Sequence, residues 1–189
     1  GEGIRVQATS SLTLDGGSRI TTDALASNGR GGDISIQTAA LSLRDATTKI
    51  ASDTQRSGGD SGVLSIQAEM LIISDGAQVS SRSASDGNGG DILIQVGSLE
   101  LNNGGLISGQ AVGDGKGADV KIKADKSVVI NGQAGSATGI SVSSLNLTFF
   151  SFGANGDAGD VNIVTPLLTL NNGGKITAES VTPDSGASG

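Results

Sequence analysis

The sequence has 189 residues, enough for one domain with a sizeable core, and it contains 31 glycines but no histidine, cysteine, tryptophan or tyrosine. Without histidine and cysteine the chain has no Ser-His or Cys-His nucleophile pair, no disulfide, and no metal site with imidazole or thiolate ligands. The net charge of −7 argues against a general nucleic-acid-binding protein, and no apolar run approaches the ~20 residues of a membrane span.

A Gly/Asp pair followed by alternating aliphatic residues recurs along the chain, as in residues 32–36 (GDISI) and 90–94 (GDILI). Weaker copies occur at 3–6 and 63–66. The first aliphatic residues of six copies are spaced by 30, 30, 28, 28 and 41 residues and are Ile4, Ile34, Leu64, Ile92, Val120 and Val161. A near-constant period of this kind indicates an internally repeated fold.

Each copy continues with a second aliphatic pair, a turn, a third short strand and a return loop. The second pairs are Leu12/Leu14, Leu41/Leu43, Leu71/Ile73, Leu99/Leu101, Val128/Ile130 and Leu168/Leu170. Turns rich in Asp, Asn and Gly, which tolerate positive φ at corners, follow at Asp15, Asp45, Asp75, Asn103, Asn131 and Asn172. The third strands are led by Ile20, Ile50, Val79, Ile107 and Ile176, with small residues two positions later.

Alternation with a period of two in such short segments predicts β-strands and no long helix. Short strands pair antiparallel in a β-sandwich or stack in parallel coils, and the recurrence of like residues at matching positions favours stacking. We therefore predict an all-β, right-handed parallel β-helix (β-solenoid), with about six coils of 28–30 residues and three short strands per coil. Residues 1–189 form one β-helix segment, which we interpret as an internal fragment of a longer repeat protein because the chain starts inside a repeat.

One outward row follows the first strand of each copy and consists of Gln7, Gln37, Gln67, Gln95, Lys123 and Val164. Stacked amides hydrogen-bond along the axis in cross-β assemblies, so we interpret this row as structural rather than as a binding row. Lys121, Lys123 and Lys126 form the only basic group in the sequence. We interpret them as solvent-exposed charges in preference to a site for an anionic ligand.

The fifth copy spans 41 residues, and we assign its extra length to an insertion at residues 137–156. Alternation at Ile140/Val142 and at Leu145/Leu147 predicts a small hairpin or strand pair that leaves the coil. Deletion of this insertion is expected to leave the stack folded.

The same insertion holds all three aromatic residues of the chain, Phe149, Phe150 and Phe152. They are candidate partner contacts, because exposed aromatic side chains are favoured at interfaces. The alternative, which we favour, is that they pin the insertion against the coil wall, because three exposed phenylalanines would promote aggregation.

Two pairs of acidic residues occupy matching positions, Asp45 with Asp75 at a corner and Asp91 with Asp119 at a strand start. In stacked coils each pair would lie ~5 Å apart, near the carboxylate spacing of a retaining glycosidase. Both pairs fall at turn positions where aspartate caps backbone N–H groups, so we favour a structural role. No cofactor is expected; a calcium ion bound by the loop at residues 86–91 (DGNGGD) is the alternative to a solvated loop.

Residues 99–108 (LELNNGGLIS), and residues 153–163 running into 165–170 (TPLLTL), carry a family resemblance. They resemble the C-terminal repeats of filamentous-haemagglutinin-like exoproteins, especially cyanobacterial proteins of the two-partner secretion type. The resemblance implies export through an outer-membrane β-barrel partner, a long right-handed β-helix at the cell surface, and roles in adhesion or biofilm formation. The N-terminal secretion domain of that family is not part of this sequence.

We therefore predict a non-enzymatic structural or adhesive segment of a large secreted or cell-surface exoprotein, a rigid rod for adhesion, aggregation or biofilm. Its expected partners are the secretion barrel implied by the resemblance, surface glycans or other copies of itself. The first alternative is a carbohydrate-binding or polysaccharide-cleaving β-helix that uses the acidic rows. An ice-binding solenoid is a weaker alternative, because the threonines do not recur in register.

Overall fold

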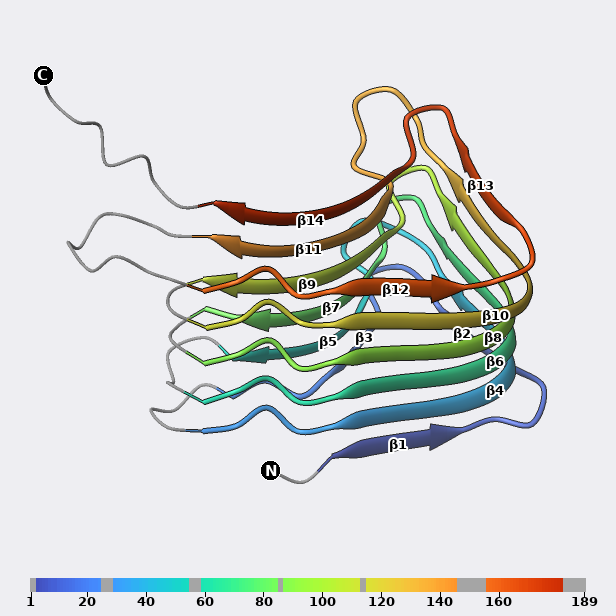
Figure 1. The fold of residues 1–189 in the computed structure, drawn as a ribbon. Helices are drawn as coiled ribbons and strands as arrows, with labels where there is room; N and C mark the ends of the chain where they lie inside the picture. The colour runs from blue at the N-terminus through green and yellow to red at the C-terminus, as the bar shows by residue number, and fades with distance from the viewer. Residues whose placement is uncertain are drawn as a thin grey trace, which may run out of the picture.

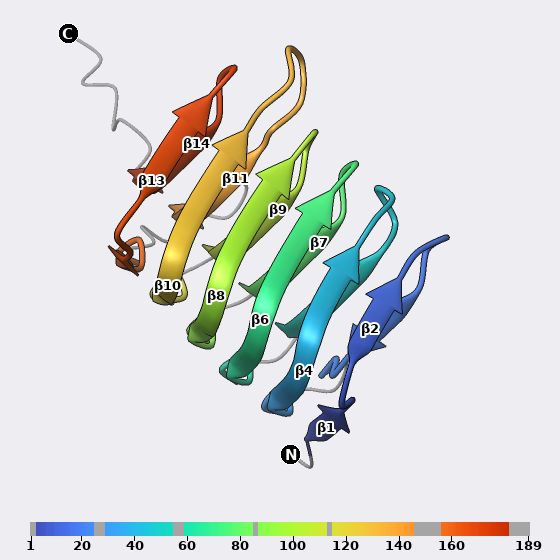
Figure 2. The same ribbon diagram turned by 90° about the vertical axis from the view of Figure 1, so that its right-hand side faces the viewer.

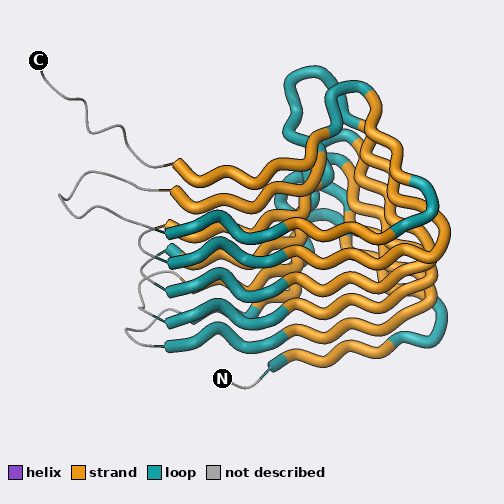
Figure 3. Tube along the Cα trace, in the orientation of Figure 1, coloured by secondary structure: helices purple, strands orange, loops and turns teal. Residues whose placement is uncertain are grey.

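The computed structural model describes residues 3–24, 29–54, 59–84, 87–112, 115–145 and 156–181. Within these ranges every regular element is a β-strand and no helix occurs (Figure 3). The described part of the chain accordingly has no helix long and apolar enough to cross a membrane.

The strands form two parallel sheets that lie on different faces of one coil stack (Figure 1). The first sheet contains β1 (Ile4–Gln7), β2 (Ser11–Leu14), β4 (Ile34–Leu43), β6 (Leu64–Ser74), β8 (Ile92–Asn102), β10 (Val120–Asn131), β12 (Val161–Val164) and β13 (Leu168–Asn171). The second sheet contains β3 (Arg19–Thr21), β5 (Lys49–Thr54), β7 (Gln78–Ser83), β9 (Leu106–Val112), β11 (Gly139–Leu145) and β14 (Lys175–Val181). Each strand pairs with its equivalent in the next coil, which confirms the predicted β-solenoid.

The coil differs from the prediction in how its strands are divided. In the four inner coils the first and second predicted strands run on as one long strand that bends at its middle, β4, β6, β8 and β10 (Figure 2). Only the end coils keep them apart, as β1 and β2 and as β12 and β13. These four inner coils, each covered on both sides, give about four complete turns, slightly fewer than the six coils predicted.

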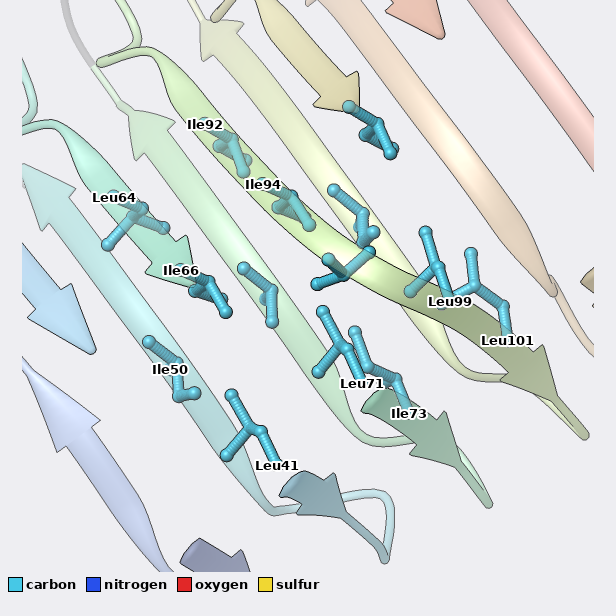
Figure 4. Close-up of a cluster of buried hydrophobic side chains, with 14 of the residues drawn as sticks. Leu41, Ile50, Leu64, Ile66, Leu71, Ile73, Ile92, Ile94, Leu99 and Leu101 are labelled. Carbon is cyan, nitrogen blue, oxygen red and sulfur yellow. The ribbon is translucent and has the colours of Figure 1, made fainter. Parts of the chain in front are cut away.

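The core is a set of aliphatic rows that run along the axis inside the stack (Figure 4). Each inner coil contributes one residue to each of five rows, and the coil led by β6 contributes Leu64, Ile66, Leu71, Ile73 and Val79. All five side chains are at most 1% exposed. Burial of each such side chain stabilises the fold by ~1.5–3 kcal/mol before entropy is counted, and stacking is what removes them from water.

The corner between the two sheets is a tight turn with left-handed backbone. Asn103 and Gly104 have φ values of 47° and 89°, and the Gly105 N–H donates to the Asn102 carbonyl over 2.9 Å. Positive φ at both central residues is the geometry of a type I′ turn, for which Asn-Gly is favoured. Five of the six predicted corners are thus confirmed, with positive φ also at Gly16, Gly17, Asp45, Asp75, Gly76, Asn172 and Gly173, whereas Asn131 ends β10 and neither it nor Gly132 has positive φ.

The return segment lies against small residues of the second sheet. Ser81 is buried, and its Oγ accepts a hydrogen bond from the Gly90 N–H over 2.8 Å. One coil earlier, the Ser52 Oγ accepts from the Gly62 N–H over 2.7 Å. A Cβ atom on Gly90 would overlap the carbonyl group of Gly62. The small third-strand positions in the sequence therefore reflect a backbone that passes directly over them.

In the fifth coil the structure has a regular strand where a hairpin was predicted. Ile140 pairs with Ile107 below it and with Ile176 above it, so residues 139–145 are the regular third strand, β11. Ile140 and Val142 are buried in the core rather than in a projection. The hairpin prediction is wrong for these residues because β11 begins later after β10 than the equivalent strand does in other coils.

The extra length of the fifth coil is distributed over three places. One additional residue lies in a bulge of β10, where the register shifts between Ala124 and Ser127. The corner from Ile130 to Ile140 is four residues longer than the corner from Leu101 to Ile107. The remaining eight residues fall between β11 and β12, and most of that segment, including Leu147, lies outside the described residues. A deletion of 137–156 would therefore remove a strand of the stack.

Candidate functional site

The corner aspartates are held by hydrogen bonds to neighbouring turns. The Asp45 carboxylate accepts from the Gly16 N–H of the preceding coil over 2.6 Å. The Asp75 carboxylate accepts from the Ser74 hydroxyl over 3.0 Å and from the Asn103 side-chain amide over 3.4 Å. Both groups therefore stabilise the corner, in agreement with the structural role favoured from the sequence.

The strand-start aspartates belong to a network of ion pairs. The Asp119 Oδ1 lies 2.9 Å from the Lys116 Nζ and accepts from the Asp160 N–H over 3.0 Å. The Lys121 Nζ lies 3.2 Å from the Asp91 Oδ2 and 3.7 Å from the Asp119 Oδ2. Lys116 and Lys121 therefore lie between carboxylates of successive coils and reduce the repulsion between them.

These contacts shift the pKa values of Asp119, Lys116 and Lys121. Desolvation raises the pKa of Asp119, but the hydrogen bonds from Lys116 and the Asp160 backbone and the charges of Lys116 and Lys121 outweigh it, so this pKa is lowered from 3.8. Hydrogen bonds to Asp119 and Asp91 raise the pKa values of Lys116 and Lys121, respectively. A glycosidase acid needs a raised carboxyl pKa, which is the opposite of the shift at Asp119.

In the glycine-rich loop considered as a calcium site, side-chain oxygen atoms are already bonded to other groups of the protein. The Asn88 Oδ1 accepts from the Lys116 N–H over 2.8 Å, and Asp91 is paired with Lys121. Asp86 lies outside the described residues. Among the residues that the structure describes, no three or more acidic side chains come together in a way that could hold a metal ion.

A groove of about 630 Å³ crosses five neighbouring coils on the outer side of the first sheet, at the bend of its long strands. One wall is the row of outward glutamines already identified in the sequence. The opposite side is made by the residues two positions later, where the inter-strand pairing skips a residue. In chain order these opposite residues are Thr9, Ala39, Glu69, Gly97 and Asp125, with Lys126 next to Asp125 in the bulge of β10.

The glutamine row does not form the continuous amide ladder that the sequence predicts. The Gln7 Nε2 donates to the Gln37 Oε1 at 3.5 Å, the outer limit of a hydrogen bond. In the described structure the side chains of Gln67 and Gln95 are exposed and have no hydrogen-bond partner. Hydrogen bonding between amides therefore does not account for these two residues, and their polar groups are available to a ligand.

The basic group lies on β10, near the C-terminal end of the first sheet. Lys121, Lys123 and Lys126 are exposed, as predicted. Lys121 and Lys123 line a second, smaller hollow of about 420 Å³, together with Gln67, Gln95, Leu93 and Val164. Lys121 is already paired with Asp91, so this hollow presents less free charge than the sequence suggests.

The groove was not predicted from the sequence. In two coils an outward glutamine is followed two residues later by a small residue, at Gln37 and Ala39 and at Gln95 and Gly97, whereas Glu69 holds this position after Gln67. The candidate contacts Phe149, Phe150 and Phe152 lie outside the described residues. Comparison with family models, with curated proteins and with solved structures gives no match.

Proposed function

We propose that this chain is a structural and adhesive segment of a large secreted or cell-surface exoprotein, in which it forms a rigid β-helical rod. The proposal draws on the resemblance of its repeats to filamentous-haemagglutinin-like exoproteins of the two-partner secretion type. An outer-membrane secretion barrel is the partner that this resemblance implies.

The observation that carries the proposal is the continuity of both sheets. Five successive parallel pairings link β1 to β12, and five more link β3 to β14. Each coil adds ~4.8 Å to the stack, and every addition extends both hydrogen-bonded ladders and the apolar rows at once. Bending such a stack would separate hydrogen bonds on one face, so the architecture suits a stiff spacer that displays its outer surface.

A purely polysaccharide-cleaving role has less support. The corner carboxylates accept hydrogen bonds from turns, and the strand-start carboxylates are bound to lysines. A retaining glycosidase combines a free carboxylate nucleophile with an acid of raised pKa, whereas the pKa of Asp119 is lowered and Asp91 is bound to Lys121. Binding without cleavage is favoured instead by the groove.

Adhesion is tested with beads coated with the whole chain and passed over bacterial biofilms under flow. We expect more beads to be retained than when the same chain is attached after unfolding, which keeps composition and charge but removes the outer surface. Equal retention of both kinds of bead would contradict an adhesive role and leave only that of a spacer.

A further inference from the structure

We propose that the groove along the glutamine row binds an extended, uncharged polysaccharide chain lying parallel to the coil axis. This inference names the ligand class of the adhesive function proposed above and rests on it. The binding residues are Gln37, Gln67 and Gln95 on one wall, with Ala39, Glu69 and Gly97 opposite them.

The shape of the groove selects a linear ligand. It crosses five coils, from the β1 coil to the β10 coil, and is therefore about 20 Å long at ~4.8 Å per coil. Its direction is that of the stack, because equivalent residues of successive strands are paired in register. One coil spacing is close to the length that a single sugar ring adds to an extended polysaccharide.

The chemistry of the wall selects hydroxyl groups. A glutamine amide offers two N–H donors and a carbonyl acceptor, and a sugar hydroxyl is also both donor and acceptor. The side chains of Gln67 and Gln95 form no hydrogen bond within the described structure, so a ligand would not have to break protein hydrogen bonds to reach them. The parallel register places them at equal positions in adjacent coils, one amide for each successive ring.

Small residues opposite Gln37 and Gln95 leave room for the ligand, whereas Glu69 lies opposite Gln67. Ala39 has only a methyl group, and Gly97 has no side chain. Gly97 cannot be enlarged without cost, because a Cβ atom there would lie 2.5 Å from the Glu69 carbonyl oxygen. The floor of the groove in this coil is thus kept open by the backbone geometry itself.

Charge selects a neutral polymer over an anionic one. The groove lining carries two carboxylates, Glu69 and Asp125, and one ammonium group, Lys126, the latter two at one end. Lys123 lies beside Gln95 in the same row and offsets part of this charge, but the whole chain has a net charge of −7, which disfavours the approach of a polyanion.

Native gels cast with hydroxyethyl cellulose, galactomannan or alginate test the inference, with Kd obtained from mobility against polymer concentration. The whole chain is compared with the double variant Q67A/Q95A and with a matched control, Q78A/Q110A, which makes the same change on the outer side of the second sheet. Far-UV circular dichroism and melting curves verify that both variants fold; both altered groove residues are exposed.

We expect at least one neutral polymer to retard the chain and alginate not to. Loss of two amides should raise Kd about tenfold in Q67A/Q95A, since each net hydrogen bond is worth a factor of a few, whereas the control should stay within twofold. Unchanged retardation of Q67A/Q95A, retardation by alginate alone, or no retardation in any gel would overturn the inference.

The bead assay separates this inference from the proposed function. If coated beads are retained on biofilms although no neutral polymer retards the chain, the adhesive role stands and the groove assignment is wrong. If Gln67 and Gln95 govern retardation but beads are not retained, the groove binds glycans and the adhesive role is wrong.

Discussion

Substitution of Gly90 by alanine tests the tightness of the stack. A Cβ atom at this position would overlap the Gly62 carbonyl group and lie 2.6 Å from the Ser61 carbonyl oxygen. The return segment would have to move outward, which would lengthen the 2.8 Å hydrogen bond from the Gly90 N–H to the Ser81 hydroxyl. Overpacking costs ~1–3 kcal/mol and a weakened buried hydrogen bond ~1–3 kcal/mol, so we expect a loss of ~2–6 kcal/mol.

The expected loss of stability in Gly90→Ala is opposite in sign to the effect that backbone entropy alone would have. A glycine-to-alanine change at an unstrained position stabilises a protein by ~0.4–1 kcal/mol through the unfolded state. Gly135 is the control, because it has open space around it and a φ of 84°, so alanine there costs only the left-handed backbone penalty, ~1–2 kcal/mol. Urea unfolding followed by circular dichroism measures both, and a G90A variant as stable as the wild type would refute the steric reasoning.

Three further changes test the core, the corner and the ion pairs. Ile66→Ala should lower the free energy of unfolding in urea by ~2–5 kcal/mol, since Ile66 is 1% exposed, and a loss no larger than that of the outward Ile72→Ala would contradict this. Asn103→Val should raise the urea sensitivity of the chain, because valine tolerates the φ of 47° poorly; Asn103→Gly is the control and should cost little. The lowered pKa of Asp119 adds stability above its ordinary value of 3.8 that is lost as pH falls through the folded pKa. Unfolding titrations should therefore show a shallower acid-side decline for Asp119→Asn than for the wild type, and parallel curves would argue against the ion pair to Lys116.

The coil architecture was predictable because its physical cause is visible in the sequence. Stacked coils place residues such as Ile34, Leu64 and Ile92 on top of one another, so a shared environment selects similar side chains at a fixed period. The Asx-Gly corners were predictable for the same reason, since only a few residue types accept positive φ.

The division into strands was harder to predict. In the β4 coil the segment between the first two aliphatic pairs, Gln37 to Ala40, contains no glycine, proline or Asx to stop a strand, and Gly97 and Asp125 in the equivalent segments do not interrupt β8 and β10. The backbone therefore remains extended through a bend, and two predicted strands become one, β4. The third strand of the fifth coil was missed because Ile140 follows Ile130 at a greater distance than the repeat suggests, although its pairing with Ile107 is regular.

The groove lay beyond prediction because it depends on relations between coils rather than on residue types. The glutamine row is obvious in the sequence, but whether amides bond to one another or remain free depends on distances that the repeat does not specify. In the structure the Gln7 side chain reaches that of Gln37, whereas the side chains of Gln67 and Gln95 form no hydrogen bond with any described residue.

Rigidity of the coil and a shallow binding groove are connected by the energetics of repeated weak contacts. One amide without an aromatic ring beside it binds a sugar weakly, since a net hydrogen bond contributes only ~0.5–1.5 kcal/mol. Because the stack fixes successive amides one coil apart, the second and third contacts on the same polymer require no further ordering of the protein. Each added coil with a glutamine in the row would therefore strengthen binding more than an equal number of amides on a flexible chain. We therefore expect a single substitution, Gln67→Ala or Gln95→Ala, to raise Kd for the neutral polymer. The fold-change should be less than half of that caused by the double substitution.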